Sequence, residues 1–264
     1  YCQQELGSPA LFLADYLEVS GPAYTLSTAC SSSARAFISA QRLLAADMAD
    51  VVLVGGADTL CGLTLNGFYS LESLAAAICA PFARERDGIN IGEAAALCLL
   101  TREVGPVALL GAGESSDAYH VSAPHPEGLG AEAAMRMALE QGGVQPEQVG
   151  YINLHGTGTR LNDAMEAKAV YRLFGDRVPC SSTKALTGHT LGAAGATEAA
   201  LAWLLLTEDL PLPHQTYLAD ERDESLAPIS LLLAPQPLAH PLVLSNSFAF
   251  GGNNVSLLLA RSEP

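Results

Sequence analysis

Short runs of β-branched residues alternate with longer Ala- and Leu-rich runs along the chain, and this alternation constrains the fold most. Apolar runs that predict buried strands occupy residues 51–54, 149–154, 178–182, 242–245 and 255–259. Apolar residues spaced by three and four positions predict helices over 36–44, 131–141, 163–174 and 195–206. Strands and helices in alternation are typical of an α/β fold with a buried sheet.

Glycine pairs predict where two of these elements end. Gly55 and Gly56 follow the first predicted strand and predict a tight turn there. Gly142 and Gly143 follow the helical run 131–141 and predict a helix C-terminus. Because ligands of open α/β sheets bind at the carboxyl ends of strands, we expect the polar turns after the strands to converge on one pocket.

The composition excludes several classes of protein. Apolar residues make up 49% of the 264 residues, which excludes a disordered chain despite a net charge of −15. The 13 lysines and arginines form no basic stripe, so we expect no nucleic-acid partner. No apolar run reaches membrane-spanning length, no secretory signal is recognisable, and the six cysteines form no C-x-x-C pair. We therefore expect a cytoplasmic protein with free thiols, bound to no membrane.

Cys30, in the segment STACSSS, is the candidate nucleophile. It follows a short strand-like run and precedes a helical one, so we predict that it opens a helix. The unpaired N–H groups and the dipole of a helix N-terminus favour a thiolate there. Taken alone, a single cysteine is more often a small buried apolar residue than a nucleophile, and the other five keep that interpretation. The interpretation therefore depends on partner residues.

Two histidines that follow predicted strands are the candidate partners. His155 begins the motif HGTGT, and His189 ends the motif STKALTGH. Lys184 lies five residues before His189, and a cation there would lower the imidazole pKa and keep the ring neutral near pH 7. A neutral ring can donate an N–H to a developing oxyanion, as enolate chemistry requires. Each histidine alone is also explained by a structural role.

Four motifs in this order resemble those of the elongating β-ketoacyl-acyl-carrier-protein synthases, type II ketosynthases of the thiolase-like superfamily. They are TACSSS, HGTGT, STKALTGHTLGAAG and NSFAFGGNN, and PFARERDGINIGEAAA resembles the segment between the first two. The resemblance implies a thiolase-like α/β fold layered α-β-α-β-α. Its N-terminal half would be residues 1–105, with the nucleophile, and its C-terminal half residues 106–264, with both histidines. The family's segment before Tyr24 is almost absent, so we expect the first half to be incomplete.

The resemblance also implies decarboxylative Claisen condensation, in which a cysteine-bound acyl chain is extended by malonyl-ACP in fatty acid, polyketide or aryl-polyene synthesis. The implied catalytic residues are Cys30, His155, His189, Lys184 and Glu198. The implied substrate-binding residues are Thr157, Thr159, Phe248 and Phe250. The backbone N–H groups of Cys30 and Phe250 would form the oxyanion hole.

Partners follow from the same resemblance. It implies an acyl carrier protein that delivers acyl and malonyl groups, and a homodimer or a heterodimer with a chain-length factor. No metal or other cofactor is implied, because phosphopantetheine arrives on the carrier protein. Arg84 and Arg86 are candidate contacts to an acidic carrier. Ala249 and the run Ala94 to Ala96 stand where the family usually has glycine, so we expect altered mobility of the loop at Phe250.

Two alternatives to this function remain. A thiolase would use a second cysteine near the C-terminus, and no cysteine follows Cys180. A non-catalytic subunit resembling a chain-length factor, or an inactive fragment, would agree with the short first half. The presence of Cys30, His155 and His189 opposes that alternative.

Overall fold

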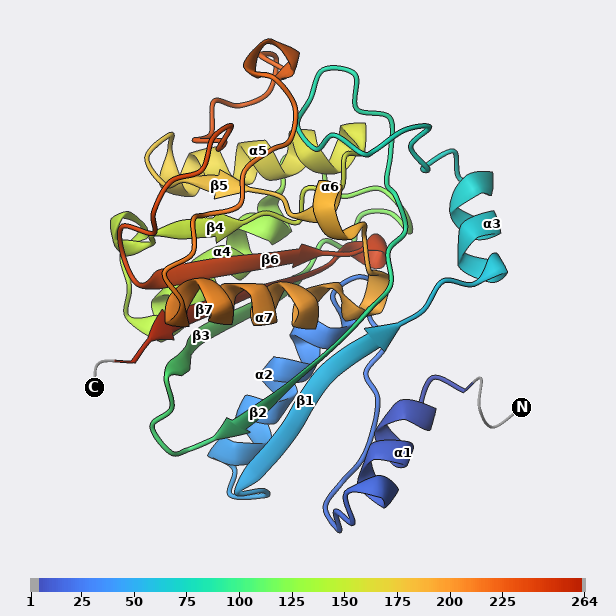
Figure 1. The fold of residues 1–264 in the computed structure, drawn as a ribbon, viewed down its shortest axis with the longest axis vertical. Coiled ribbons are helices and arrows are strands. Elements are labelled where there is room, and N and C mark those ends of the chain that lie inside the picture. Colours follow the sequence, from blue (N-terminus) through green and yellow to red (C-terminus); the bar gives the residue numbers. More distant parts are fainter. Residues whose placement is uncertain (1–4, 263–264) are drawn as a thin grey trace.

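Two sheets and two layers of helices make up the part of the chain that the structure describes, residues 5–262 of a computed structural model (Figure 1). A five-stranded sheet has the order β3-β7-β6-β4-β5, and a separate two-stranded sheet pairs β1 with β2. The strands are β1 (Val51–Asp58), β2 (Ala94–Thr101), β3 (Val107–Ser116), β4 (Tyr151–Asn153), β5 (Cys180–Ser181), β6 (Leu242–Phe248) and β7 (Asn253–Arg261). Strand β4 is parallel to β5 and β6, whereas β7 is antiparallel to β6 and β3.

The described helices are α1 (Ser8–Tyr16), α2 (Ser32–Ala45), α3 (Gly62–Ser70), α4 (Leu129–Gly142), α5 (Arg160–Phe174), α6 (Lys184–Thr187) and α7 (Ala194–Thr207). Helices α4 and α5 cover one face of the larger sheet and α2 and α7 the other, whereas α1 and α3 lie outside these layers (Figure 1). Short 3₁₀ turns are η2 (Pro146–Gln148), η3 (Leu191–Ala193), η4 (Ala219–Glu221) and η5 (Phe250–Gly252). None of these helices is both long and apolar enough to cross a membrane.

The five-stranded sheet separates two hydrophobic cores, because successive side chains of a strand point to opposite faces. Tyr151 and Leu257 pack with α2 and α7 on one face. Their neighbours Ile152 and Leu258 pack with α4 and α5 on the other. Both faces of this sheet are therefore covered.

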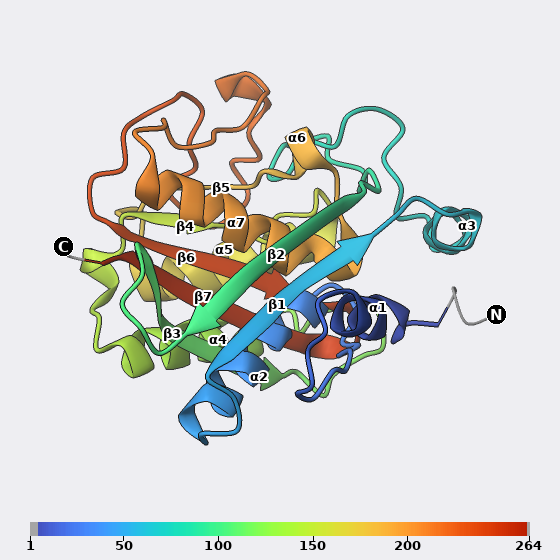
Figure 2. The same cartoon turned by 60° about the horizontal axis from the view of Figure 1, so that its bottom comes forward.

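Helices α2 and α7 lie between the two sheets, as Figure 2 shows with the pair β1–β2 in front. Val54 of β1 is buried on the side of these helices. The opposite face carries Leu53 and Leu99, which are cross-strand partners and are 38% and 65% exposed. The order of layers in the described residues is thus β-α-β-α. This confirms the predicted layered α/β architecture, of whose five predicted layers four are present among the described residues.

One local prediction about glycine was wrong. Gly55 and Gly56 do not turn the chain but continue strand β1 to Asp58, opposite Leu97 and Ala96. A side chain at Gly56 would overlap Ser33 at the start of α2, so glycine lets the helix approach the strand. Ala94 to Ala96, which stand where the family usually has glycine, form the start of β2.

The backbone of Ala249, which stands where the family usually has glycine, is not strained. Its φ of −102° and ψ of 156° are extended values that any residue adopts. The left-handed positions of this loop are Gly251 and Gly252, with φ of 84° and 76°. The loop therefore keeps glycine where glycine is needed.

Candidate active site

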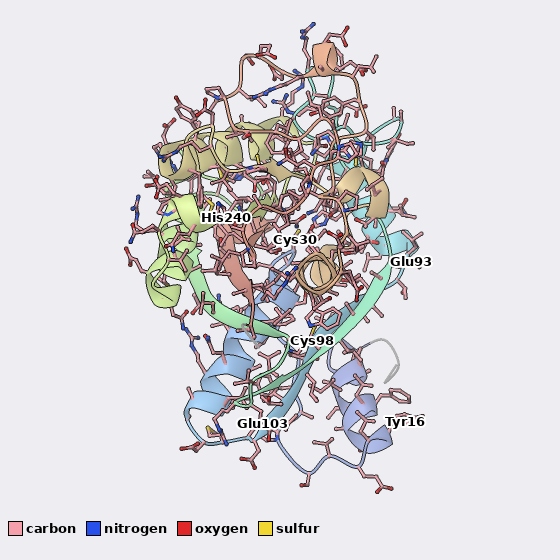
Figure 3. The ribbon with its side chains drawn as sticks, turned by 60° about the vertical axis from the view of Figure 1, so that its left-hand side comes forward. Tyr16, Cys30, Glu93, Cys98, Glu103 and His240 are labelled. Atoms are coloured by element: carbon pink, nitrogen blue, oxygen red, sulfur yellow. The ribbon has the colours of Figure 1, made fainter. Side chains whose placement is uncertain are left out.

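Cys30 lies just before helix α2 and is 6% exposed. The prediction that it opens the helix is off by two residues, because the helix begins at Ser32 after the N-cap Ser31. Ala29, directly before the cysteine, has a positive φ of 53°, which is rare for a residue with a side chain. A sharp turn of the backbone thus directs the sulfur into the interior of the molecule (Figure 3).

The structure brings the sulfur of Cys30 and both histidines together. Nε2 of His189 lies 3.0 Å from Sγ of Cys30, at hydrogen-bonding distance. The rings of His155 and His189 meet edge to face, with centroids 5.3 Å apart. One donor atom from each of the three residues lies within 4.8 Å of the other two. Cys30, which precedes the two histidines by 125 and 159 positions in the chain, therefore forms one buried cluster with them.

Elements from both halves of the chain position the histidines. His155 follows strand β4. His189 follows the short helix α6, and its backbone N–H donates a hydrogen bond of 2.7 Å to the carbonyl oxygen of Asn90. Its own carbonyl accepts a hydrogen bond of 3.0 Å from the N–H of Gly92. The segment between the nucleophile and the first histidine thus supports the second histidine.

Burial, more than charge, determines the protonation of the cluster. It lowers the pKa of both His155 and His189 well below 6.5, and the Lys184 cation lowers it further. Both rings are therefore neutral at pH 7, as predicted. The expected thiolate is wrong: burial raises the pKa of Cys30 to about 11, which outweighs Lys184 and the nearby N–H groups. Cys30 is a thiol at neutral pH and needs a base.

Lys184 and Glu198 form a buried ion pair beside the cluster. Nζ of Lys184 lies 2.6 Å from Oε1 of Glu198, and the two residues are 1% and 3% exposed. Burial raises the pKa of Glu198, whereas the lysine lowers it. Because the two charges largely cancel, the cluster lies next to a dipole rather than beside an isolated cation.

Two backbone N–H groups point at the sulfur of Cys30, its own and that of Phe250. These are the two groups expected to form an oxyanion hole. Phe250 begins η5 and packs against Phe68 of α3, with ring centroids 5.9 Å apart. Phe248 is buried and lies edge to face with His155 at 6.2 Å.

Thr157 and Thr159 lie in the turn that follows His155. Their hydroxyl groups are hydrogen-bonded to each other at 2.9 Å. Thr157 is 6% exposed and Thr159 is half-buried, so the pair extends from the cluster toward the surface. This placement suits hydroxyl groups that contact an entering polar chain.

Two carboxylates that the sequence analysis did not assign to the site hold this turn in place. Glu166 of α5 accepts hydrogen bonds from the N–H groups of His155 and Gly156, at 2.8 and 2.7 Å. Asp163, also of α5, accepts hydrogen bonds from the N–H groups of Gly158 and Phe82, at 3.3 and 2.8 Å. Acids in the first turns of a helix commonly serve its dipole, which hides this role from the sequence.

Arg86 does not fit the predicted carrier contact. It is 5% exposed, and its guanidinium lies 2.6 Å from Asp223 and 3.7 Å from Asp163. It therefore links the loop after η4 to the turn of His155. Arg84 is exposed and donates a hydrogen bond to the carbonyl of Asp220.

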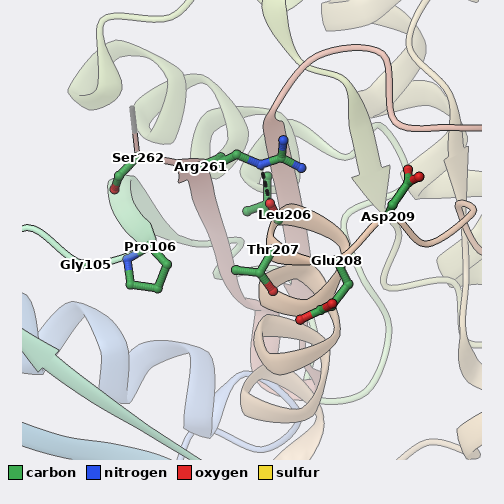
Figure 4. A pocket seen from close by; sticks show the side chains of 8 residues that line it. All are labelled: Gly105, Pro106, Leu206, Thr207, Glu208, Asp209, Arg261 and Ser262. Carbon is green, nitrogen blue, oxygen red and sulfur yellow. Dashed lines mark hydrogen bonds between the residues drawn. The ribbon is translucent and has the colours of Figure 1, made fainter. Parts of the chain in front are cut away.

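A pocket of about 560 Å³ lies away from the cluster, at the opposite end of α7 (Figure 4). Arg261 donates a hydrogen bond across it to the carbonyl of Leu206. Since a 14-residue helix is about 20 Å long, this pocket is remote from His189. Its lining residues are Gly105, Pro106, Leu206, Thr207, Glu208, Asp209, Arg261 and Ser262.

Comparisons with curated proteins identify relatives of this chain. It is 37% identical to 3-oxoacyl-[acyl-carrier-protein] synthase 2 of Rhizobium meliloti, in a match that covers 91% of this chain and 61% of the relative. It is 34% identical to nodulation protein E of the same organism, with 91% and 62% covered. The chain thus spans less than two thirds of the length of these relatives.

Solved structures agree. The ketosynthase ApeO of Xenorhabdus doucetiae, solved in complex with its chain length factor ApeC, is 61% identical with a TM-score of 0.98 over 99% of this chain and 66% of that one. A β-ketoacyl synthase of Burkholderia phymatum is 30% identical with a TM-score of 0.91, over 97% and 66%.

Family models match most of the chain in two consecutive ranges. Residues 9–104 match the N-terminal domain of β-ketoacyl synthases, and residues 107–217 match the C-terminal domain. With the buried Cys-His-His cluster and the structural likeness, these matches show that the chain belongs to the β-ketoacyl synthase family.

Proposed function

We propose that the protein is a β-ketoacyl-acyl-carrier-protein synthase that joins a cysteine-bound acyl chain to malonyl-ACP. The 3.0 Å contact between Sγ of Cys30 and Nε2 of His189, with His155 beside it, carries this proposal. A thiol, two neutral imidazoles and two N–H groups on the sulfur are the groups that acyl transfer and enolate chemistry need.

In the first step, Cys30 takes the acyl group from the carrier. The sulfur attacks the thioester carbonyl, its proton passes to the leaving phosphopantetheine thiol, and an acyl-cysteine forms. His189 is the base within reach of the thiol. The N–H groups of Cys30 and Phe250 hold the oxygen of the tetrahedral intermediate.

In the second step, His155 and His189 bind the carbonyl oxygen of malonyl-ACP through ring N–H groups. Loss of CO2 leaves an enolate, whose carbon attacks the acyl-cysteine carbonyl. The carbon–sulfur bond then breaks, β-ketoacyl-ACP leaves, and the Cys30 thiolate takes up a proton from water. Neutral rings suit this step, because an N–H donor that stays neutral stabilises the enolate without protonating it.

The proposal also assigns the catalytic residues to two parts of the chain and includes a partner protein. The nucleophile belongs to residues 1–105 and the histidines to residues 106–264. We expect a heterodimer with a chain-length factor, as in the ApeO complex, supported by the exposed apolar side chains of Leu11, Phe12 and Tyr16 on α1. Free thiols at the five described cysteines support a cytoplasmic location.

Acyl transfer to the protein tests this function. After incubation with acyl-ACP, mass spectrometry should find the acyl group on Cys30, none in Cys30→Ala, and full loading in the control Cys61→Ala, whose thiol is exposed. His189→Ala should load more slowly and form no condensation product with malonyl-ACP. Equal acylation of the protein and Cys30→Ala would overturn the assignment.

A second candidate, a non-catalytic partner subunit, is opposed by the intact cluster of Cys30, His155 and His189. It predicts no acylation of Cys30 under any condition. Loading restored only when a chain-length factor is added would instead identify the partner as a requirement of catalysis.

A further inference from the structure

The donor atoms of the cluster form a set that a borderline divalent metal ion prefers. One sulfur and two imidazole nitrogens lie within 4.8 Å of one another, all on buried residues. Zinc bonds of about 2.3 Å to sulfur and about 2.0 Å to nitrogen separate the ligands of a tetrahedral ion by roughly 3.3 to 3.6 Å. Sγ of Cys30 and Nε2 of His189 lie 3.0 Å apart, and no two of the three donor atoms are separated by more than 4.8 Å. Each side chain would move by less than about 1 Å.

The charges around the cluster also suit a metal ion. The charged groups beside the cluster, Lys184 and Glu198, are paired with each other at 2.6 Å, so no uncompensated cation repels a metal ion.

One feature limits the affinity. Nδ1 of His155 and Nδ1 of His189 are buried and have no hydrogen-bond partner among the described residues. Most metal-binding histidines donate this N–H to a carboxylate or carbonyl, and losing such a partner weakens binding by about 10 to 100-fold. The site therefore suits a reversible ligand better than a permanent one.

We infer that Zn²⁺ binds Cys30, His155 and His189 and inhibits the enzyme reversibly. The thiol gives up its proton to water, a sulfur–zinc bond replaces the contact between the sulfur and His189, and a water molecule takes the fourth position. Zinc is here an inhibitor and not a cofactor, because it occupies the nucleophile. The inference concerns the site of the proposed function but rests on its geometry alone.

Alkylation of the cysteines tests the inference without any substrate. Zn²⁺ should slow the modification of Cys30 by iodoacetamide at least tenfold, and EDTA should restore the rate. Modification of the exposed Cys61, followed in the same digest, should not change. His155→Ala/His189→Ala should lose the protection, whereas the matched control His120→Ala/His240→Ala, which changes two exposed histidines, should keep it.

Equilibrium dialysis gives a second readout that does not depend on the histidine variants folding. The protein should bind one more Zn²⁺ than Cys30→Ala. Equal binding by the two proteins, or protection of Cys30 that survives the loss of both cluster histidines, would overturn the inference. Failure of acyl loading with intact zinc protection would count against the proposed function alone.

Discussion

Glu166 is a buried carboxylate whose protonation is linked to the stability of the turn at His155. Its oxygens accept hydrogen bonds from two backbone N–H groups, and burial raises its pKa to about 7. An unfolded chain loses this proton near pH 4.5. Between these values the folded protein binds more protons than the unfolded one, so the group's contribution to stability is greatest below about pH 4.5 and decreases as the pH rises through 7.

The variant Glu166→Gln should isolate this effect. The stability of the protein relative to the variant should fall by about 2 kcal/mol between pH 5 and pH 7, because one pKa unit corresponds to about 1.4 kcal/mol. Urea unfolding at both pH values measures the difference, in which the other titrating groups cancel. The control Glu208→Gln, at an exposed position, should follow the wild-type profile. Parallel profiles for Glu166→Gln would contradict the prediction.

Glu166 and Asp163, the two acids that hold the turn at His155, show which contacts sequence motifs do not predict. The cluster residues stand in short motifs after strands, so their type and spacing predicted a common site. Glu166 and Asp163 act on backbone N–H groups of a neighbouring turn, and no side-chain pattern encodes such contacts. The pKa of Cys30 was missed for a related reason, since burial of the sulfur depends on packing and not on neighbours in the chain.

At the scale of secondary-structure elements, the geometry of the cluster depends most on the contact between helices α2 and α7. A side chain added at Gly195 of α7 would lie 2.6 Å from the backbone nitrogen of Ala34 of α2. This distance is shorter than any normal contact, and backbone atoms cannot rotate away. Since Cys30 precedes α2 and His189 precedes α7, the spacing of these helices sets the distance between sulfur and ring.

We therefore expect Gly195→Ala to separate the two helices. The variant should lose about 1 to 3 kcal/mol of stability, as overpacked cores do, and acyl loading of Cys30 should slow. The matched control is Gly67→Ala in α3, where nothing lies within 4 Å and alanine should stabilise the helix by about 0.5 to 1 kcal/mol. Thermal unfolding and the loading rate check both variants; an unaffected Gly195→Ala would show that the helices adapt.

Helices with strong periodicity were predictable, whereas strands rich in glycine or alanine were not. The four predicted helices correspond to α2, α4, α5 and α7 within a few residues, and Gly143 adopts the left-handed conformation expected at a helix end. Strand β2 begins with three alanines, which have low β propensity, and β1 continues through two glycines. Close helix approach, a tertiary requirement, overrides the local preference in β1.

At the scale of the whole molecule, the outer face of the β1–β2 sheet is the surface that most favours association between chains. The cross-strand pair Leu53 and Leu99 is exposed there, and no described strand pairs with either outer edge of the sheet. Open edges and apolar faces promote association between chains. Whatever covers this face in a longer chain or in an assembly would remove the hazard.

The variant Leu53→Lys/Leu99→Glu should reduce association of this chain. The two substitutions place opposite charges on cross-strand partners, which preserves the pairing of β1 with β2. Light scattering at increasing protein concentration should fall relative to the unmodified chain. A single charge at the exposed Val104, outside the sheet, serves as the control and should change little. Unchanged scattering of the double variant would place the associating surface elsewhere.

Cys30 lies just before α2 and His189 just before α7, so the hydrogen bond between them crosses the contact between these two helices. A hydrogen bond of 3.0 Å is lost once the two helices separate by about 1 Å, even when both hydrophobic cores remain folded. The reactivity of the Cys30 thiol therefore depends on how closely α2 and α7 pack. Mild heat or denaturant should lower this reactivity before the secondary structure unfolds, and cooling should restore it.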